Sequence, residues 1–381
     1  MTDQILSNIS LEMLCREQGE PFTQLSPGDP VKVRILCSIR EASDVPYRST
    51  AMYCGRVKDV VVFGKSYVTD RAGRGVFFGQ SHRDYERADF LDLYKSQIMK
   101  EQGVRPLIEQ ECCFLGGWPN FGHFLFEYLY RLVAFDMVGA LDRLPVVVFD
   151  DMPEAWLSFI ELYGVPKGRI LRIPRLPAPQ FNSVWIAGCP NALSQKHEYT
   201  FWDDGIQRLR DRLRENAAEV HGGRGGPKKI FFGRKGTSHR RLLNEDEAGQ
   251  YLSSRGFESP DIAGLSAADQ IQIVASAEII VLVSGAGSPI TCFAPDTCSI
   301  IEIRPPSISG VLGSKGFAAV VGQTFTPLEG RVVSPDAERS FMDQDIEISM
   351  DLLRSHVDLA LNKQELLANV ARHSAARAAK K

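Results

Sequence analysis

The apolar residues follow two different patterns along the chain. Between residues 30 and 110, short runs rich in β-branched and aromatic residues are separated by turns and predict strands over 31–37, 56–64, 65–70 and 75–79. From about residue 120, helical periodicity alternates with apolar runs of strand length. There we expect helices over 121–138, 153–164 and 200–219, and strands over 144–150 and 182–188.

A glycine-rich segment interrupts this alternation. The nine residues HGGRGGPKK over 221–229 include four glycines and a proline, a composition typical of a linker. Beyond it we expect strands over 229–234, 278–285 and 298–303, and helices over 244–256, 266–277 and 287–294. This pattern predicts an α/β protein with two Rossmann-like, parallel-sheet lobes and a ligand site in the cleft between them, beyond the carboxyl ends of the strands.

The expected domain boundaries follow from that linker. We expect an N-terminal lobe over 1–220, the linker over 221–228, a C-terminal lobe over 229–345, and a helix with a basic tail over 346–381. Asp343 and Asp345 are expected to cap the last helix. The basic, alanine-rich tail is interpreted as a solvated helix, with weak attachment to an anionic membrane face as the alternative.

Charge and cysteine content exclude several classes. Lys and Arg number 44 against 47 Asp and Glu, giving a net charge of −3, so no basic field indicates nucleic-acid binding. The eight cysteines contain no C-x-x-C pair, which argues against a zinc ribbon and favours free thiols in a reducing compartment. The first residues lack the features of a signal peptide, and no run of 18 apolar residues occurs, so we expect a cytoplasmic protein.

The first candidate site is the segment GGWPNFGHFLFEYLYRL over 116–132. Asn120 is placed to cap a helix in which His123 and Glu127, four residues apart, share one face. A histidine with a carboxylate one turn later is a typical general-base arrangement, and a polar network between neighbouring helices is the alternative. Asp150 and Asp151, at the end of the strand over 144–150, are a third option for the base, and capping of the following helix is the favoured interpretation of Asp151.

The second candidate site is FFGRKGTSHRRLLNEDE over 231–247. Arg234, Arg240 and Arg241, with Lys235, lie between the end of a strand and the start of a helix. This combination suits a phosphate or diphosphate, whereas a solvated basic loop is the alternative. Asn244 is expected to cap the following helix together with Glu247.

The third candidate site is the turn Ser284, Gly285, Ala286 and Gly287, followed one strand later by Glu302. Small residues let backbone N–H groups approach an anion, and an acidic group at the end of the next strand can accept hydrogen bonds from ribose hydroxyls. A tight strand-to-helix turn is the alternative. Ile290 occupies the position of the third glycine, so the dinucleotide-binding fingerprint fails.

Taken in order, these motifs resemble glycosyltransferase family 61. The resemblance is carried by NFGHFLFEYLYRL (120–132), Arg234 with RRLLNEDE (240–247), SGAGSPITCFAP (284–295) and IIEI (300–303). It implies a GT-B architecture and an inverting, metal-independent transfer of a hexosyl or pentosyl group without a cofactor. The implied partners are a nucleotide-sugar donor in the C-terminal lobe, with a UDP-sugar favoured, and a glycan or lipid-linked glycan acceptor. Bacterial relatives are implicated in the assembly of capsules and other surface polysaccharides.

The chain departs from the family pattern at the third motif. Family members commonly carry His-Gly-Ala-Gly-Leu, whereas Ser284 replaces that histidine here and Ser288 with Pro289 replaces the apolar residue. A serine hydrogen-bonds a phosphate but carries no positive charge. Donor binding is therefore assigned first to the three arginines of the second motif.

The motifs together give a mechanistic hypothesis and two alternatives. His123, which we favour over Glu127, takes a proton from the acceptor hydroxyl, while the arginines and the glycine turn stabilise the departing nucleotide diphosphate. A nicotinamide-dependent oxidoreductase is one alternative, indicated by the G-x-G turn and the later acidic residue. A catalytically silent sugar-binding subunit is the other, indicated by Ser284.

Overall fold

The computed structural model describes residues 8–26, 31–37, 42–49, 52–64, 66–77, 94–98, 104–188, 192–193, 199–306, 313–333 and 343–378. The chain divides into two compact units. The first unit comprises residues 1–33, 46–220 and 264–268, and the second comprises residues 34–45, 221–263 and 269–381. Each unit is built on a sheet of its own.

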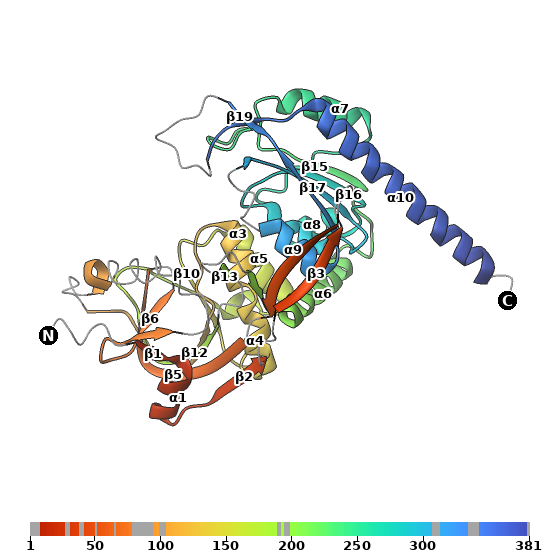
Figure 1. The fold of residues 1–381 in the computed structure, drawn as a ribbon. Helices are drawn as coiled ribbons and strands as arrows, with labels where there is room; N and C mark the ends of the chain where they lie inside the picture. The colour runs from red at the N-terminus through yellow and green to blue at the C-terminus, as the bar shows by residue number, and fades with distance from the viewer. Residues whose placement is uncertain are drawn as a thin grey trace. The chain divides into compact units, whose positions relative to one another are not determined.

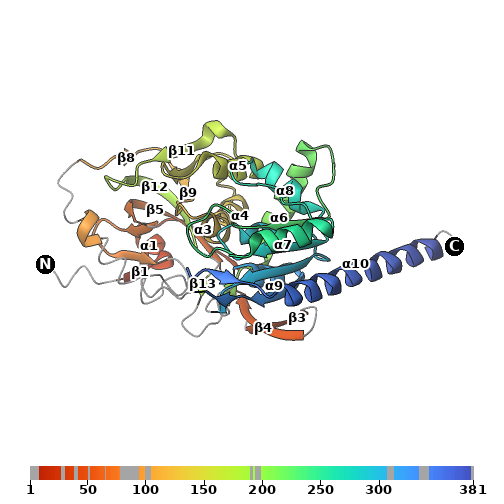
Figure 2. The same ribbon diagram turned by 90° about the horizontal axis from the view of Figure 1, so that it is seen from above.

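The first unit contains a ten-stranded sheet in the order β1, β7, β6, β5, β12, β9, β10, β11, with β2 also paired to β5 and β8 to β12. Figure 2 shows β5, β12, β9 and β11 in this part of the molecule. The strands are β1 (Asn8–Ser10), β2 (Phe22–Ser26), β5 (Met52–Phe63), β6 (Tyr67–Thr69), β7 (Gly75–Phe77), β8 (Leu107–Ile108), β9 (Cys112–Phe114), β10 (Val146–Phe149), β11 (Ile170–Ile173) and β12 (Gln180–Ala187).

The expectation of a parallel sheet in this region is only partly correct. Strands β9, β10 and β11 pair in parallel. Strand β12 is parallel to β9 on one side but antiparallel to β5 on the other, and β5, β6 and β7 continue the same sheet in antiparallel pairs. The reason is packing: Val57 and Val60 of β5 join Phe114 of β9 and Val184 of β12 in one buried core. A long apolar strand such as β5 gains more from extending this core than from forming a separate layer.

The helices of the first unit follow local signals closely. They are α1 (Leu11–Gln18), η2 (Tyr94–Ile98), α3 (Phe121–His123), η3 (Phe124–Tyr128), α4 (Arg131–Met137), α5 (Glu154–Tyr163), η4 (Lys167–Arg169) and α6 (Asp203–Val220). Gly164 ends α5 in the left-handed conformation, with φ of 116°, as the sequence predicts. The helix expected over 121–138 keeps a right-handed helical backbone where α3, η3 and α4 join, but its middle, η3, is a π-helical turn.

A further four-stranded sheet has the order β13, β14, β4, β3. It comprises β3 (Val31–Cys37), β4 (Ala42–Ser49), β13 (Ala192–Leu193) and β14 (Tyr199–Phe201). The strand expected over 31–37 is therefore confirmed.

The second unit contains a parallel four-stranded sheet in the order β15, β16, β17, β18. Helices α7 and α10 lie over one face of this sheet (Figure 1), where Leu252 and Leu353 share a buried core with Val281. The elements are β15 (Lys229–Phe232), α7 (Glu245–Ser254), α8 (Ala267–Ala275), β16 (Ile279–Val283), η5 (Ser288–Phe293), β17 (Ser299–Arg304), α9 (Gly313–Val321), β18 (Thr324–Glu329), β19 (Arg331–Val332), β20 (Ile346–Glu347) and α10 (Met350–Ala378). The predicted βα alternation is confirmed here.

Two capping expectations in this unit are wrong. Asp345 precedes the short strand β20 rather than the last helix, and its carboxylate accepts hydrogen bonds from the backbone N–H and guanidinium of Arg241. Asn244 precedes α7 but makes no side-chain cap; its amide donates to and accepts from the backbone of Ile348. In both cases a partner about a hundred residues away along the chain satisfies the side chain, and local sequence patterns do not encode such a partner.

The cysteines and the helices have no feature of a disulfide or a membrane span within the described residues. The six described cysteines outside β3 are free and buried. Within the parts of the chain that the structure describes, no helix combines the length and apolar character needed to cross a bilayer.

Candidate functional site

In the first unit, the carboxyl ends of three parallel strands are joined by one arginine. Arg175, which follows β11, donates two hydrogen bonds of 2.9 and 2.7 Å to the carboxylate of Asp151, which follows β10. It also donates to the carbonyl of Gly117, beyond the end of β9, at 3.2 Å. Its guanidinium carbon lies 3.9 Å from the ring centroid of Phe149. Ligands bind preferentially at this edge of a parallel sheet.

Asp151 therefore has a different role from the helix cap considered for it. The residue immediately before α5 is Pro153, and the carboxylate of Asp151 is held by Arg175 in a bidentate ion pair. Bidentate pairs are among the stronger polar contacts in proteins. Sequence reasoning missed Arg175 because it lies 24 residues beyond Asp151 in an irregular segment, with no motif around it.

His123 and Glu127 lie on the helix that begins at this edge. Asn120 caps the helix, as predicted, by accepting a hydrogen bond from the backbone N–H of His123 at 3.2 Å. The Nδ1 atom of His123 is 2.8 Å from Oε1 of Glu127. The histidine side chain is 51% exposed and that of Glu127 is 24% exposed, so the pair faces solvent while its geometry is fixed.

This pair has the geometry of an oriented base. A carboxylate at Nδ1 favours the tautomer with the proton on that nitrogen, so the lone pair is on Nε2 and can accept a proton. The π-helical turn η3 starts directly after His123, and such turns occur frequently at functional sites.

Aromatic packing fixes the position of this helix. Phe121 and Phe124 contact Trp156 and Phe159 of α5, with ring centroids 5.5 to 6.3 Å apart. Together with Tyr128, Leu132 and Phe135, Phe124 forms the apolar face of this helical segment, and all four of these side chains are buried. The polar pair is therefore carried on a rigid, buried support.

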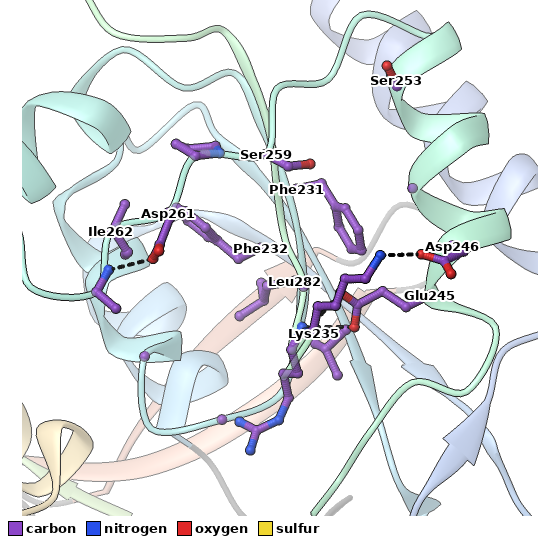
Figure 3. Close-up of a pocket in the computed structure, with 18 of the residues that line it drawn as sticks. Phe231, Phe232, Lys235, Glu245, Asp246, Ser253, Ser259, Asp261, Ile262 and Leu282 are labelled. Atoms are coloured by element: carbon purple, nitrogen blue, oxygen red, sulfur yellow. Dashed lines mark hydrogen bonds and ion pairs between the residues drawn. The ribbon is translucent and has the colours of Figure 1, made fainter. Parts of the chain in front are cut away.

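The second unit contains a pocket of about 1040 Å³ at the carboxyl ends of β15 and β16. Figure 3 shows Glu245 and Asp246 of α7 on one side of it and Ser259, Asp261 and Ile262 on the other. Its lining includes three groups from the second and third motifs: Arg234, Lys235 and the turn residues Gly285, Gly287 and Ser288. The volume lies at the upper end of the range for small-molecule sites.

Arg234 and the glycine turn meet in this pocket. The guanidinium of Arg234 lies so close to Gly285 that a Cβ atom at that position would overlap Nη1. Burial, followed by repulsion from Arg240, lowers the pKa of Arg234. Among the described residues no carboxylate forms an ion pair with it, and its buried Nε has no hydrogen-bond partner there. A partly desolvated cation in this state is a strong anion receptor.

Glu245 organises the loop that carries Arg234. Its carboxylate accepts hydrogen bonds from the backbone N–H groups of Arg234 and Lys235, at 2.9 and 3.1 Å. Gly233 is required beneath it, because a Cβ atom there would overlap Oε1 of Glu245. Sequence reasoning missed this role, although an acidic residue in the first turn of the helix after the basic loop was a visible signal.

The turn itself is only partly available to a ligand. The backbone N–H of Ser284 donates to Ile303 and that of Gly285 to the hydroxyl of Ser288. The backbone N–H groups of Ala286 and Gly287 donate no hydrogen bond within the described parts of the chain. Within this turn, the backbone N–H groups that stay available for an anion are therefore those of Ala286 and Gly287.

Arg240 and Arg241 are not among the residues that line the pocket. Nε of Arg240 lies 3.6 Å from the carboxylate of Asp343, and Arg241 pairs with Asp345 at 2.6 Å. Arg240 still adds positive charge beside Arg234, as its effect on the pKa of Arg234 indicates. Arg241 is neutralised by its own partner, so the structure does not bring it together with Arg234.

Glu302 lies behind the turn rather than in the pocket lining. It is 4% exposed, and its carboxylate accepts a hydrogen bond from Ser314 at 2.5 Å. Burial raises the pKa of Glu302, while hydrogen bonds from Ser314, Ser288 and Ser284 and the Arg304 cation act against that rise. The carboxylate is thus placed to hold the turn in position, and a direct contact with a ribose stays a prediction.

Comparison with known families agrees with the order of these elements. Residues 121–301 match the model of the family Glycosyltransferase 61. This match shows that the segment over 121–301 is similar to glycosyltransferase family 61. The matched segment begins at the helix of His123 and ends within β17, so it includes the pocket of the second unit. A comparison with curated proteins found no match. The match supports a transferase with a sugar donor and an acceptor as its partners.

The contact between Arg234 and Gly285 gives a direct test of ligand binding in the pocket of the second unit. Gly285→Ala is expected to displace the guanidinium and to weaken the binding of a nucleoside diphosphate by about tenfold, which corresponds to one strong charged hydrogen bond. Gly287→Ala meets open space and is expected to weaken binding less. Titration calorimetry with both variants measures the difference. Equal affinities would show that the position of Arg234 is unimportant.

Proposed function

We propose that this protein is an inverting glycosyltransferase of family 61 that moves a sugar from a nucleotide-diphosphate-sugar to a hydroxyl group of a glycan acceptor. The observation that carries the proposal is Arg234, a partly buried cation without an ion-pair partner among the described residues, which lies against Gly285 in the pocket of the second unit. A pocket with this charge fits the diphosphate, and its apolar wall at Phe232, Ile262 and Leu282 fits the nucleoside.

In the proposed mechanism, Nε2 of His123 takes the proton of the acceptor hydroxyl as the hydroxyl oxygen bonds to the anomeric carbon. The bond between that carbon and the diphosphate oxygen breaks at the same time, and attack from the opposite face inverts the configuration. Glu127 keeps the imidazole oriented and stabilises its positive charge after proton transfer. Arg234 and Arg240 stabilise the charge that develops on the nucleoside diphosphate.

These cations also support transfer without a metal ion. The leaving group gains negative charge in the transition state, and fixed guanidinium groups can stabilise that charge in place of a divalent cation. Transfer by the purified protein in the presence of a chelator tests this part of the proposal. Loss of transfer that Mg²⁺ or Mn²⁺ restores would contradict it.

For the whole molecule we propose a GT-B arrangement in which the base of the first unit and the pocket of the second face a common cleft. We propose a UDP-sugar as donor, a hexosyl or pentosyl group as the transferred sugar, and a glycan or lipid-linked glycan as acceptor, as the resemblance to family 61 implies. We further propose a role at the cytoplasmic side, in the synthesis of a capsule or another surface polysaccharide.

A ligand screen tests the function most directly. A ligand bound only by the native state raises the melting temperature by mass action, so nucleoside diphosphates and their sugars are expected to stabilise the protein. NADH serves as the comparison, because the alternative of an oxidoreductase predicts stabilisation by NADH instead. Slow hydrolysis of the stabilising nucleotide-sugar would then exclude a catalytically silent subunit. Stabilisation by no nucleotide at all would contradict the proposal.

The last helix supports weak attachment to a membrane surface. Leu366, Leu367 and Val370 of α10 are 37 to 63% exposed and lie on one side of the helix, in a segment that also carries Arg372 and Arg377. Co-sedimentation with vesicles is expected to be measurable with anionic lipids and absent with neutral ones. Leu366→Ser combined with Val370→Ser is expected to abolish it, whereas Leu243→Ser, at an exposed site outside this helix, leaves it unchanged. If the double variant of α10 and Leu243→Ser sediment equally with anionic vesicles, attachment through the exposed face of α10 is contradicted.

A further inference from the structure

The carboxyl end of β17 carries an arginine, in addition to Arg234, that lies outside the three candidate motifs. Arg304, the last residue of β17, is 3% exposed. Its Nε and Nη1 atoms are buried and have no hydrogen-bond partner among the described residues. The carboxylate of Glu302 forms a long ion pair with Arg304, 3.9 Å from Nη1, which is too far for a hydrogen bond.

A second cation lies beside it. Lys315 is in the first turn of α9, directly after Ser314, and is half-buried. Burial and the positive charge of Arg304 lower the pKa of Lys315. Two cations thus lie close together at the N-terminal end of a helix, where the helix dipole also favours a negative charge.

This arrangement is unfavourable in the absence of a ligand. A buried arginine whose N–H groups lack acceptors costs free energy, and so does repulsion between two cations. The charge of Glu302 offsets only part of this free-energy cost. Burial raises the pKa of Glu302, and its carboxylate already accepts hydrogen bonds from serine hydroxyls. A buried group left unsatisfied in this way calls for an explanation, and a bound anion is one that satisfies both cations.

The pair is connected to the pocket through buried contacts. Ser288, which lines the pocket, hydrogen-bonds Glu302, and Glu302 lies next to Arg304. Strand β17 is the parallel neighbour of β16, so Arg304 lies at the same edge of the sheet as the glycine turn. A diphosphate over Ala286 and Gly287 would have its second cationic partner on this side.

We propose that Arg304 and Lys315 form a phosphate-binding subsite at the carboxyl end of β17, opposite Arg234 across the glycine turn. The proposal rests on the proposed function in so far as the phosphate belongs to a nucleotide-sugar donor. Arg304 supplies Nε and Nη1 as donors, and Lys315 supplies a flexible ammonium group at the exposed side.

Calorimetric titration with inorganic pyrophosphate at constant ionic strength tests the subsite. Lys315→Met keeps the aliphatic stem and is expected to weaken pyrophosphate binding at least about tenfold, as is Arg304→Met. Each has a matched control from an exposed ion pair of the same unit: Lys228→Met, from the pair with Glu278, and Arg331→Met, from the pair with Glu347. Both controls are expected to bind pyrophosphate as the unmodified protein does.

A stability measurement separates ligand binding from a structural role. Removing Lys315 relieves repulsion, so the free energy of unfolding of Lys315→Met without ligand is expected to be unchanged or higher. A structural ion pair would instead lower it. If Arg304→Met does not fold, Lys315→Met alone decides the question. Unchanged pyrophosphate affinity in folded Lys315→Met overturns the proposal, and so does the absence of binding by the unmodified protein.

The subsite and the proposed function fail in different ways. If pyrophosphate binding depends on Lys315 but no nucleotide-sugar is bound or turned over, the phosphate site stands and the glycosyltransferase function is wrong. If a nucleotide-sugar is turned over while Lys315→Met keeps full pyrophosphate affinity, the function stands and the subsite is overturned.

Discussion

Replacing His123 with alanine is expected to lower the rate of sugar transfer by about 100- to 10,000-fold, the range typical for loss of a general base. The imidazole is held by Glu127 at 2.8 Å, so the variant removes the proton acceptor while the helix keeps its cap at Asn120 and its aromatic support. Glu127→Ala is expected to have a smaller effect, because it removes the group that orients the base. Steady-state kinetics with a saturating donor measures both.

The matched control is His373→Ala, an exposed histidine on α10 that is expected to leave the rate unchanged. Circular dichroism checks that each variant is folded. If His123→Ala and Glu127→Ala both keep full turnover, the base assignment is wrong. If Glu127→Ala has the larger effect, the carboxylate is the base and His123 positions it.

Replacing Arg234 with glutamine is expected to lower kcat/KM by about 100- to 1,000-fold. This is the range typical for the loss of one hydrogen-bond donor to a negative charge that develops in the transition state. The guanidinium lies in the pocket against Gly285 and has no ion-pair partner among the described residues, so its charge is available to the leaving diphosphate. Because burial and Arg240 already lower its pKa, the charge is unfavourable in the free protein. The free energy of unfolding is therefore expected to stay the same or rise.

Arg255→Gln is the matched control, since Arg255 lies in the same unit, is exposed and pairs with Asp358. It is expected to change neither kcat/KM nor donor affinity. An Arg234→Gln variant that loses stability but keeps kcat/KM would identify Arg234 as a structural residue. A loss of kcat/KM with unchanged stability would support its place at the leaving group.

The secondary structure was largely predictable because it depends on local patterns. The apolar runs that become β10, β16 and β17 have the length and composition of buried strands. Gly164 ends α5 because the chain needs a left-handed residue there, and Asn120 caps its helix because its side chain reaches a backbone N–H three residues away. Each of these features depends on residues within a few positions of one another along the chain.

The site was predictable as a set of motifs but not as a geometry. The sequence identified Arg234 and Gly285, yet only the structure shows that they touch. It grouped Arg241 with Arg234, although Arg241 is bound by Asp345 and is absent from the pocket lining, which includes Arg234. Arg304, Lys315 and Glu245 were missed because their importance comes from burial and from neighbours distant along the chain.

By itself the sequence determined the fold class, the order of helices and strands, and the positions of the basic loop and of the pair His123 and Glu127. These depend on periodicity, capping and charge, which act between residues close together along the chain. The tertiary structure alone decided that β5 joins β12 antiparallel, that Arg175 binds Asp151, and which cations lack a partner. The physical reason is that desolvation and long-range pairing depend on where distant segments meet, and local patterns leave that open.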